Sequence, residues 1–308
     1  MFKSFFKRPA KPPKRGDLSR YTLLRTVGKG SMSVVFKAKD ADGKDYAIKV
    51  LQPETLELRN RLNPMRGGLS EGELAYSLQH PHIIHTVDYG KDRDGKKEFI
   101  VMELIEGILL KNLIGANAPE IKDDPVGLFI AIGEALSYVH NKGYIHRDFC
   151  PKNVFLLKDG RNLLFDFGLT ISIQAASHTQ GFRTGTASYM APELIRRART
   201  DQRTDIYSYG VTMYEVMTGT KPYGGSGTIE RMIQLLNSEP RDPKLYNPDI
   251  PDELCEIFMK CLEKDPEKRF HTADRVVDRL RTFRDSQRES PPSSPKEAPQ
   301  GKGESHLS

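Results

Sequence analysis

Three oxygen-bearing side chains, Asp148, Asn153 and Asp166, flank a segment that has the pattern of a β-hairpin. Residues 153–165 consist of two apolar runs separated by the turn sequence Lys-Asp-Gly. Because a hairpin returns its far end to its start, the three side chains should meet at one end of one ribbon. Magnesium takes oxygen ligands and is commonly held by carboxylates together with substrate phosphates. The spacing therefore predicts a phosphoryl-transfer site, with Asn153 and Asp166 as metal ligands and Asp148 facing an incoming hydroxyl group.

These residues resemble the catalytic loop and the metal loop of the eukaryotic-type (Hanks-type) protein kinases. The matching motifs are His-Arg-Asp at 146–148, followed by Asn153, and Asp-Phe-Gly at 166–168. Either tripeptide alone arises by chance, whereas the two at this spacing are specific. The resemblance implies an ATP-dependent protein serine/threonine kinase that uses ATP and Mg²⁺, similar to soluble bacterial members of the family.

The resemblance covers residues 21–284 and implies an α+β, bilobal fold. The expected N-lobe, at about 21–105, is small and rich in β-strands, and the expected C-lobe, at about 106–284, is larger and rich in helices. The basic, proline-rich residues 1–20 are predicted to be a disordered tail. The proline- and serine-rich residues 285–308 are predicted to be a second one.

A glycine-rich turn follows the first strand-like run and reads G-x-G-x-x-S-x-V, with Ser33 in place of a third glycine. Glycines allow backbone N–H groups to approach phosphate oxygens closely. A strand-like run follows the turn, and this favours a kinase loop over a dinucleotide site, which requires a helix there. The resemblance assigns nucleotide contacts to Val27, Gly28, Lys29, Gly30, Ser31, Met32, Ser33 and Val35.

The run Tyr-Ala-Ile-Lys resembles the kinase strand that carries the phosphate-binding lysine. Strand alternation points Ala47 and Lys49 to the same face. There Ala47 would leave room for adenine and Lys49 would reach the α- and β-phosphates. Lys49 needs an anionic partner, and the helix-like residues 69–79 offer Glu71 and Glu73. The distance from the following His-Pro matches the family at Glu71, which is the predicted partner.

A further strand-like run ends in residues that resemble the kinase hinge. Met102 would be the gatekeeper, and the backbone groups of Glu103 and Ile105 would contact the edge of adenine. Phe155 would form the floor beneath the base. Leu109 stands where many family members carry a polar ribose contact, so ribose would be held differently.

The catalytic loop departs from the family pattern at Cys150, where serine/threonine kinases carry a lysine that neutralises the γ-phosphate. We expect Lys152 to take over this role and Cys150 to be a small packed residue rather than a reactive thiol. Thr186 resembles the threonine that bonds to the catalytic aspartate, Asp148, in serine/threonine kinases. This feature favours Ser/Thr hydroxyls of proteins as substrates.

Two other functions remain as alternatives. Cys150 and Ser33 are compatible with a pseudokinase or scaffold that binds nucleotide and partners without catalysis. However, the metal, base and lysine positions are filled, which favours an active enzyme. A small-molecule kinase of related fold is the third reading, against which the Ala-Pro-Glu segment at 191–193 argues, since small substrates need no peptide platform.

The segment after the metal loop has the features of an activation segment. Arg147, next to the catalytic aspartate, implies a cationic pocket for a phosphorylated residue. Thr179 and Thr184 are the candidate sites, and autophosphorylation there is expected. Glu193 is predicted to pair with Arg269, because buried charges persist only when they are paired.

The remaining elements follow from apolar periodicity and from helix start and stop signals. A helix from Asp205, which stops at Gly219, is expected to brace the His-Arg-Asp backbone with its N-terminus. Residues 63–68 form an insertion-like loop to which no role is assigned. The other expected strands are 22–27, 34–40 and 45–51, and the other expected helices are 125–142, 228–237, 252–263 and 272–284.

Composition limits location and partners. Residues 1–20 hold seven Lys or Arg and one Asp, which accounts for the whole net charge of +6. The rest of the chain balances, so nucleic acid is not expected as a partner. The basic tail could make weak contact with an anionic membrane, the alternative being a solvated tail. No apolar run reaches the length of a membrane span. The three cysteines form neither a Cys-x-x-Cys motif nor an even set for disulfides, which is typical of a protein of the reducing cytoplasm. The protein is expected to be cytoplasmic, with peripheral contact at the inner membrane surface as an option; the oligomeric state is left open.

Overall fold

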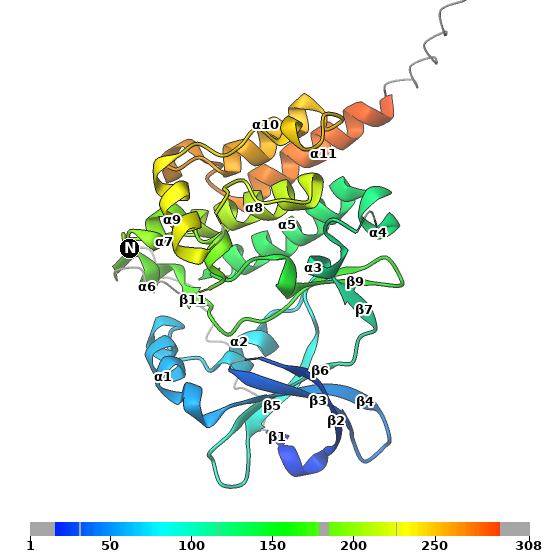
Figure 1. Ribbon diagram of the computed structural model, residues 1–308. Helices are drawn as coiled ribbons and strands as arrows, with labels where there is room; N and C mark the ends of the chain where they lie inside the picture. Colours follow the sequence, from blue (N-terminus) through cyan, green and yellow to red (C-terminus); the bar gives the residue numbers. More distant parts are fainter. Residues whose placement is uncertain (1–15, 31, 117, 179–184, 226, 290–308) are drawn as a thin grey trace, which may run out of the picture.

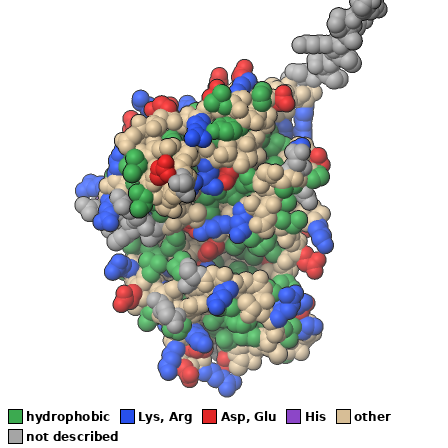
Figure 2. All heavy atoms as spheres, in the orientation of Figure 1, with side chains coloured by type: hydrophobic (Ala, Val, Ile, Leu, Met, Phe, Trp, Pro, Cys, Tyr) green, Lys and Arg blue, Asp and Glu red, His purple; other side chains and the backbone are tan. Residues whose placement is uncertain are grey.

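The computed structural model describes residues 16–289, apart from 31, 117, 179–184 and 226, and shows two lobes (Figure 1). The smaller lobe is built on a β-sheet and the larger one is mainly helical, as expected for a bilobal protein kinase fold. On the face seen in Figure 2, hydrophobic side chains lie along the boundary between the lobes and on both lobes, and basic and acidic side chains are interspersed among them. Among the described residues, every helix is too short or too polar to cross a lipid bilayer.

The small lobe contains one six-stranded sheet in the order β1-β5-β6-β4-β3-β2. The predicted strands are present, and their alternation buries one set of side chains around Ile48 and Phe99. Neighbouring strands are antiparallel except for β1, which runs parallel to β5. The strands are β1 (Gly16–Asp17), β2 (Thr22–Lys29), β3 (Ser33–Lys39), β4 (Asp45–Leu51), β5 (Thr86–Lys91) and β6 (Glu98–Glu103).

Helical elements of the structure lie beyond both ends of the predicted domain, residues 21–284. Ahead of residue 21, Asp17 accepts a hydrogen bond from the Ser19 amide at 2.9 Å and closes a short 3₁₀ turn. The Tyr21 hydroxyl donates to Asp88 at 3.2 Å and ties this turn to β5. At the other end, α11 (Ala273–Glu289) continues past the expected end at residue 284. The hydrogen bond from Tyr21 to Asp88 joins residues 67 positions apart and has no signal in the local pattern.

Two helices connect β4 to β5. They are α1 (Leu56–Met65) and α2 (Glu71–Ser77), of which only α2 was expected. The stretch 63–68, interpreted as a loop, begins inside α1 and ends in a turn where Gly67 and Gly68 have φ angles of 72° and 86°. Pro64 within the helix and two glycines directly after it obscured the helical pattern.

The large lobe packs around α5 and α8, whose side chains form the centre of the main hydrophobic core. Phe129 and Leu136 of α5 are buried there with Tyr209 and Tyr214 of α8. The helices are α3 (Leu110–Leu113), α4 (Pro119–Lys122), α5 (Pro125–Asn141), α6 (Ile173–His178), α7 (Pro192–Ile195), α8 (Arg203–Thr218), α9 (Thr228–Asn237) and α10 (Asp252–Cys261), followed by α11.

The predicted hairpin is formed by β9 (Val154–Leu157) and β10 (Asn162–Leu164), which pair antiparallel. Gly160, with a φ of 85°, completes its turn, as the Lys-Asp-Gly sequence indicates. β7 (Gly107–Leu109) adds a third strand beside β9. A separate pair, β8 (Tyr144–Ile145) and β11 (Ile171–Ser172), joins the segments before the catalytic loop and after the metal loop. Both loops are therefore fixed at the interface between the lobes.

Candidate active site

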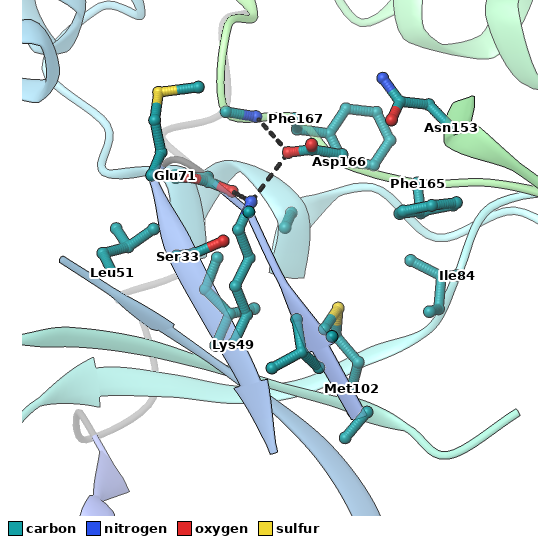
Figure 3. Close-up of a pocket in the computed structure, with 18 of the residues that line it drawn as sticks. Ser33, Lys49, Leu51, Glu71, Ile84, Met102, Asn153, Phe165, Asp166 and Phe167 are labelled. Carbon is teal, nitrogen blue, oxygen red and sulfur yellow. Dashed lines mark hydrogen bonds and ion pairs between the residues drawn. The ribbon is translucent and has the colours of Figure 1, made fainter. Parts of the chain in front are cut away.

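Lys49 of β4 lies between two carboxylates. Its Nζ is 2.6 Å from Glu71 Oε1 and 2.8 Å from Asp166 Oδ1 (Figure 3). Burial opposes the charge of Lys49, but Asp166 and Glu71 outweigh burial and raise the pKa of the ammonium. Burial also acts to raise the pKa of the Asp166 carboxyl, but Lys49 outweighs it and lowers that pKa to about 2. Lys49 and Asp166 are therefore both charged at neutral pH.

The N-terminus of α2 explains why Glu71, and not Glu73, faces Lys49. The Ser70 hydroxyl accepts from the Glu73 amide at 3.1 Å, and Glu73 Oε2 accepts from the Ser70 amide at 2.7 Å. This reciprocal capping box commits Glu73 to the helix end. Gly72 allows α2 to approach β5, because a Cβ there would lie 2.6 Å from Cβ of Tyr89.

Asp148 accepts hydrogen bonds on both carboxylate oxygens. Oδ1 accepts from the amide and the hydroxyl of Thr186 at 2.7 and 2.8 Å. Oδ2 lies 2.8 Å from Nζ of Lys152 and 3.1 Å from Nδ2 of Asn153. Cys150 is fully buried, and burial raises the pKa of its thiol to about 12. The structure therefore places Lys152, and not Cys150, in the ion pair with Asp148.

The backbone around Asp148 is held in an unusual conformation. Arg147 has a φ of 67°, in the left-handed region that costs energy for a non-glycine residue. The buried carboxylate of Asp205 accepts from the amides of His146 and Arg147 at 2.7 and 2.8 Å, and lies 2.9 Å from Nε2 of His140. The brace is therefore this side chain, inside the first turn of α8, and not the helix N-terminus as expected.

Asp166 and Asn153 present oxygen atoms on the same side of the cleft. Asp166, with a φ of 68°, is turned toward Lys49, and its Oδ1 accepts from the Gly168 amide at 3.3 Å. Nδ2 of Asn153 donates to the carbonyl of Asp148 at 2.7 Å, which leaves the carboxamide oxygen to face the pocket (Figure 3). Two oxygen ligands fit a Mg²⁺ ion that is completed by phosphates and water. Among the described residues, no group of three His, Cys, Asp or Glu side chains forms a self-sufficient metal site.

The predicted nucleotide contacts line one cleft of about 720 Å³ between the lobes. The cleft is also lined by Asp148, Lys152, Asn153 and Asp166. Ser31, Thr179 and Thr184 lie outside the described residues. The predicted residues that line the cleft are Val27, Gly28, Lys29, Gly30, Met32, Ser33, Val35, Ala47, Lys49, Glu71, Met102, Glu103, Ile105 and Phe155.

The cleft has further walls that the sequence did not indicate. Phe165 stacks on Phe155, with ring centroids 4.8 Å apart. Leu58, Leu62 and Arg66, from α1 and the residue directly after it, line the side near the metal loop. No helix was predicted over residues 56–62, and residues 63–68 were interpreted as a loop, so no pattern pointed to these three side chains.

The end of the activation segment is anchored by the predicted ion pair between Glu193 and Arg269. The guanidinium of Arg269 donates to Oε1 and Oε2 of Glu193 at 2.7 and 2.8 Å in a bidentate pair. The same guanidinium donates to the carbonyl oxygens of Arg203 and Glu263 at 2.9 and 2.7 Å. The charge is thus fully engaged although the Arg269 side chain has no exposed surface.

Comparisons with known proteins agree with this geometry. The family model described as protein kinase domain matches residues 21–279. The chain is 32% identical over 262 residues to a probable serine/threonine-protein kinase of Clostridium perfringens, which covers 84% of this chain and 37% of that protein. It is 30% identical over 272 residues to serine/threonine-protein kinase PrkC of Bacillus subtilis, covering 87% and 41%. It is 31% identical over 260 residues to serine/threonine-protein kinase PknB of Mycobacterium tuberculosis, covering 82% and 41%.

The chain thus spans about two fifths of the length of the curated relatives it matches. The matched part coincides with the two lobes and includes every motif around the cleft. On this evidence the chain belongs to the protein kinase family, in the Hanks-type serine/threonine branch.

Proposed function

We propose that the protein transfers the γ-phosphate of ATP to serine or threonine hydroxyls of proteins. The observation that supports this most strongly is the arrangement around Asp148 and Lys49 in one cleft. Asp148, a carboxylate suited to orient a hydroxyl, lines the same cleft as Lys49, a lysine suited to hold phosphates. Glu71 and Asp166 fix the position of Lys49. Phosphoryl transfer depends mainly on such positioning and on electrostatic stabilisation.

Each residue has a distinct role in this proposal. Lys49 binds the α- and β-phosphates and is held in place by Glu71. Asn153 and Asp166 would hold Mg²⁺, which supplies charge neutralisation at the phosphates when it is bound. Asp148 orients the acceptor hydroxyl and receives its proton. Lys152, 2.8 Å from Asp148, stabilises negative charge that develops on the transferred group.

Thr186 supports hydroxyl side chains of proteins as acceptors. Its amide and hydroxyl fix Asp148 and thereby join the peptide-binding end of the activation segment to the catalytic carboxylate. We further infer autophosphorylation of the activation segment, with Thr179 and Thr184 as candidate sites. ATP, Mg²⁺ and protein substrates are the partners that this function requires.

The proposed location is the cytoplasm, where ATP is supplied and the three cysteines stay reduced. Weak contact of the basic residues 1–15 with an anionic membrane is a separate proposal. Co-sedimentation with anionic vesicles, compared between the full chain and a chain that lacks residues 2–15, tests it. Equal binding of the two would contradict a role of this segment.

The function is tested by incubating the protein with ATP and Mg²⁺ and mapping phosphorylated residues by mass spectrometry. We expect phosphoserine or phosphothreonine on the protein or on an added substrate, and none with Asp148→Asn. Cys150, at the usual lysine position, and Ser33, in place of the third glycine, are the features that favour a pseudokinase instead. Nucleotide binding without any transfer by the wild-type protein would support that alternative and overturn the proposal.

A further inference from the structure

Arg66 is a buried cation that donates hydrogen bonds to the metal loop, although it lies about one hundred residues before that loop in the sequence. The residue follows the last residue of α1 and is only 1% exposed. Its Nε donates to the carbonyl of Thr170 at 2.9 Å, and its Nη2 donates to the carbonyl of Gly168 and lies 3.5 Å from that of Phe167. The three carbonyls belong to the four residues that directly follow Asp166.

This placement is costly if stability is its only purpose. No carboxylate lies within 4 Å of the guanidinium among the described residues, and its buried Nη1 has no hydrogen-bond partner there. Burial opposes the charge of Arg66 and lowers the pKa of its guanidinium, while Glu71, Glu98 and Asp166 favour the charge from a greater distance. A buried cation without a paired anion usually lowers stability, and an apolar side chain would fill the space at less cost. What the guanidinium adds is a set of directed donors to one loop.

The same turn also positions Glu71. Arg66 precedes Glu71 by only five residues, and the connection between them is tight. Asn63 accepts from the Gly68 amide at 2.9 Å through its carbonyl, and its side chain donates to the carbonyl of Leu69 at 3.2 Å. Movement of the guanidinium relative to α2 is therefore restricted. The turn holds both the helix that carries Glu71 and the loop that carries Asp166.

α1 itself is anchored to the activation segment. Leu62 and Met65 are buried in a small hydrophobic cluster with Leu169, Ile171 and Ala176. The cluster holds α1 against β11 and also includes Ala176 of α6. The three segments lie near one another in Figure 1. Arg66 thus approaches the metal loop from a packed support and not from a free loop.

We propose that Arg66 is a positioning residue for phosphate transfer, which holds the loop 167–170 so that Asp166 faces Lys49 and the phosphates. Its donors contact backbone carbonyls and not the side chains of Lys49, Asp148 or Asp166, so it acts through the backbone of the metal loop. Because it links that loop to α2, it keeps the carboxylates of Asp166 and Glu71 at fixed positions on the two sides of Lys49. This inference rests on the proposed function only for its kinetic consequence.

The test uses Arg66→Met, Arg66→Lys and the control Arg61→Ala, whose residue lies exposed on α1. Hydrogen exchange of the nucleotide-free protein reports on the loop directly. We expect amides of residues 167–172 to exchange about tenfold faster with Arg66→Met and at the wild-type rate with Arg61→Ala. Arg66→Lys keeps the charge but not the fork of donors, and should give an intermediate rate.

Kinetics then separate positioning from folding. In Arg66→Met and Arg66→Lys we expect kcat to fall by about tenfold or more, and the Mg²⁺ concentration for half-maximal rate to rise by a similar factor. Binding of ADP without Mg²⁺ should change by less than about threefold, because the adenine pocket is untouched. Both effects should be seen at a temperature where circular dichroism shows each variant folded.

Wild-type exchange at 167–172 together with a wild-type Mg²⁺ requirement in a folded Arg66→Met protein would overturn the inference. If Arg66→Met does not fold, the same criteria apply to Arg66→Lys. If the wild-type protein transfers no phosphate, the proposed function fails. The exchange experiment still decides whether Arg66 holds the loop.

Discussion

Lys152 places its ammonium group beside Asp148. In most serine/threonine kinases of the family, this group comes from a lysine at the position that is Cys150 here. The Nζ of Lys152 is 2.8 Å from Asp148, and its side chain is 43% exposed toward the cleft. We expect Lys152→Ala to lower kcat by about 10²-fold and to change KM for ATP little, because charge stabilisation is lost and the adenine pocket is intact. Steady-state kinetics with a peptide substrate measure both constants.

A suitable control is Lys158→Ala, since Lys158 is 85% exposed and only 3.8 Å from the equally exposed Glu106. Its kcat should equal that of the wild-type protein. An unchanged kcat in Lys152→Ala would contradict the assigned role of Lys152.

Cys150 should be chemically inert. Its side chain is fully buried, and burial raises the pKa of the thiol to about 12, so at pH 8 only about one molecule in 10⁴ carries the reactive thiolate. We expect iodoacetamide to modify partly exposed Cys255 in the native protein and to leave Cys150 unmodified. Peptide mapping after labelling measures this, with denatured protein as the control. If native Cys150 is labelled as fast as Cys255, its thiol is accessible to solvent and the prediction is wrong.

At the scale of the element, the catalytic loop depends on α8 through one carboxylate. Removal of the charge in Asp205→Asn leaves at least one buried amide, of His146 or Arg147, poorly satisfied. We expect the free energy of unfolding to fall by about 2–3 kcal/mol at pH 7. Denaturant titration measures it, and Asp249→Asn, an exposed carboxylate, should change it by less than about 0.5 kcal/mol.

The same carboxylate predicts a pH dependence. Burial acts to raise the pKa of Asp205, but hydrogen bonding to His140 and the nearby amides outweighs it and lowers the pKa. A group whose pKa is lower in the folded state stabilises the fold above its unfolded pKa, and this contribution is lost as the pH falls below about 4. The unfolding free energy of the wild-type protein should therefore fall more steeply than that of Asp205→Asn between about pH 5 and pH 3. Parallel curves would contradict the assignment.

Elements with strong local signals could be predicted from the sequence. The hairpin was found from its turn residues, and α5 from its Asp-Pro start and its apolar face. α1 was missed because Pro64 and two following glycines signal a break. The contacts of Arg66 join residues about one hundred positions apart, so no local pattern records them. The sequence correctly predicted that the helix containing Asp205 supports the catalytic loop. Only the structure showed that the Asp205 carboxylate makes this contact.

At the scale of the whole molecule, Arg269 connects the activation segment to the far end of the large lobe. Arg269→Ala would leave Glu193 as a buried, unpaired charge. We expect a loss of about 3–5 kcal/mol in the free energy of unfolding, since breaking a buried pair leaves the partner uncompensated. Thermal and denaturant unfolding measure this loss.

The matched control is Arg279→Ala, which removes a half-exposed pair with Glu253 at 3.2 Å and should cost less than about 1 kcal/mol. Equal losses in the two variants would show that the buried pair is not the anchor described above.

The molecule as a whole is organised so that both lobes contribute to one cleft. The small lobe supplies Lys49 and Glu71, and the large lobe supplies Asp148, Asn153 and Asp166. The central claim is that these groups transfer phosphate from ATP with a metal held by Asp166.

The most direct measurement of this claim is transfer of label from γ-labelled ATP to protein, as a function of Mg²⁺, by the wild-type chain and by Asp166→Ala. We predict Mg²⁺-dependent transfer by the wild-type protein and a fall of at least about 10³-fold in Asp166→Ala, while Mg²⁺-free ADP still binds to both. Undiminished transfer by Asp166→Ala, or transfer that is independent of Mg²⁺, would contradict the account.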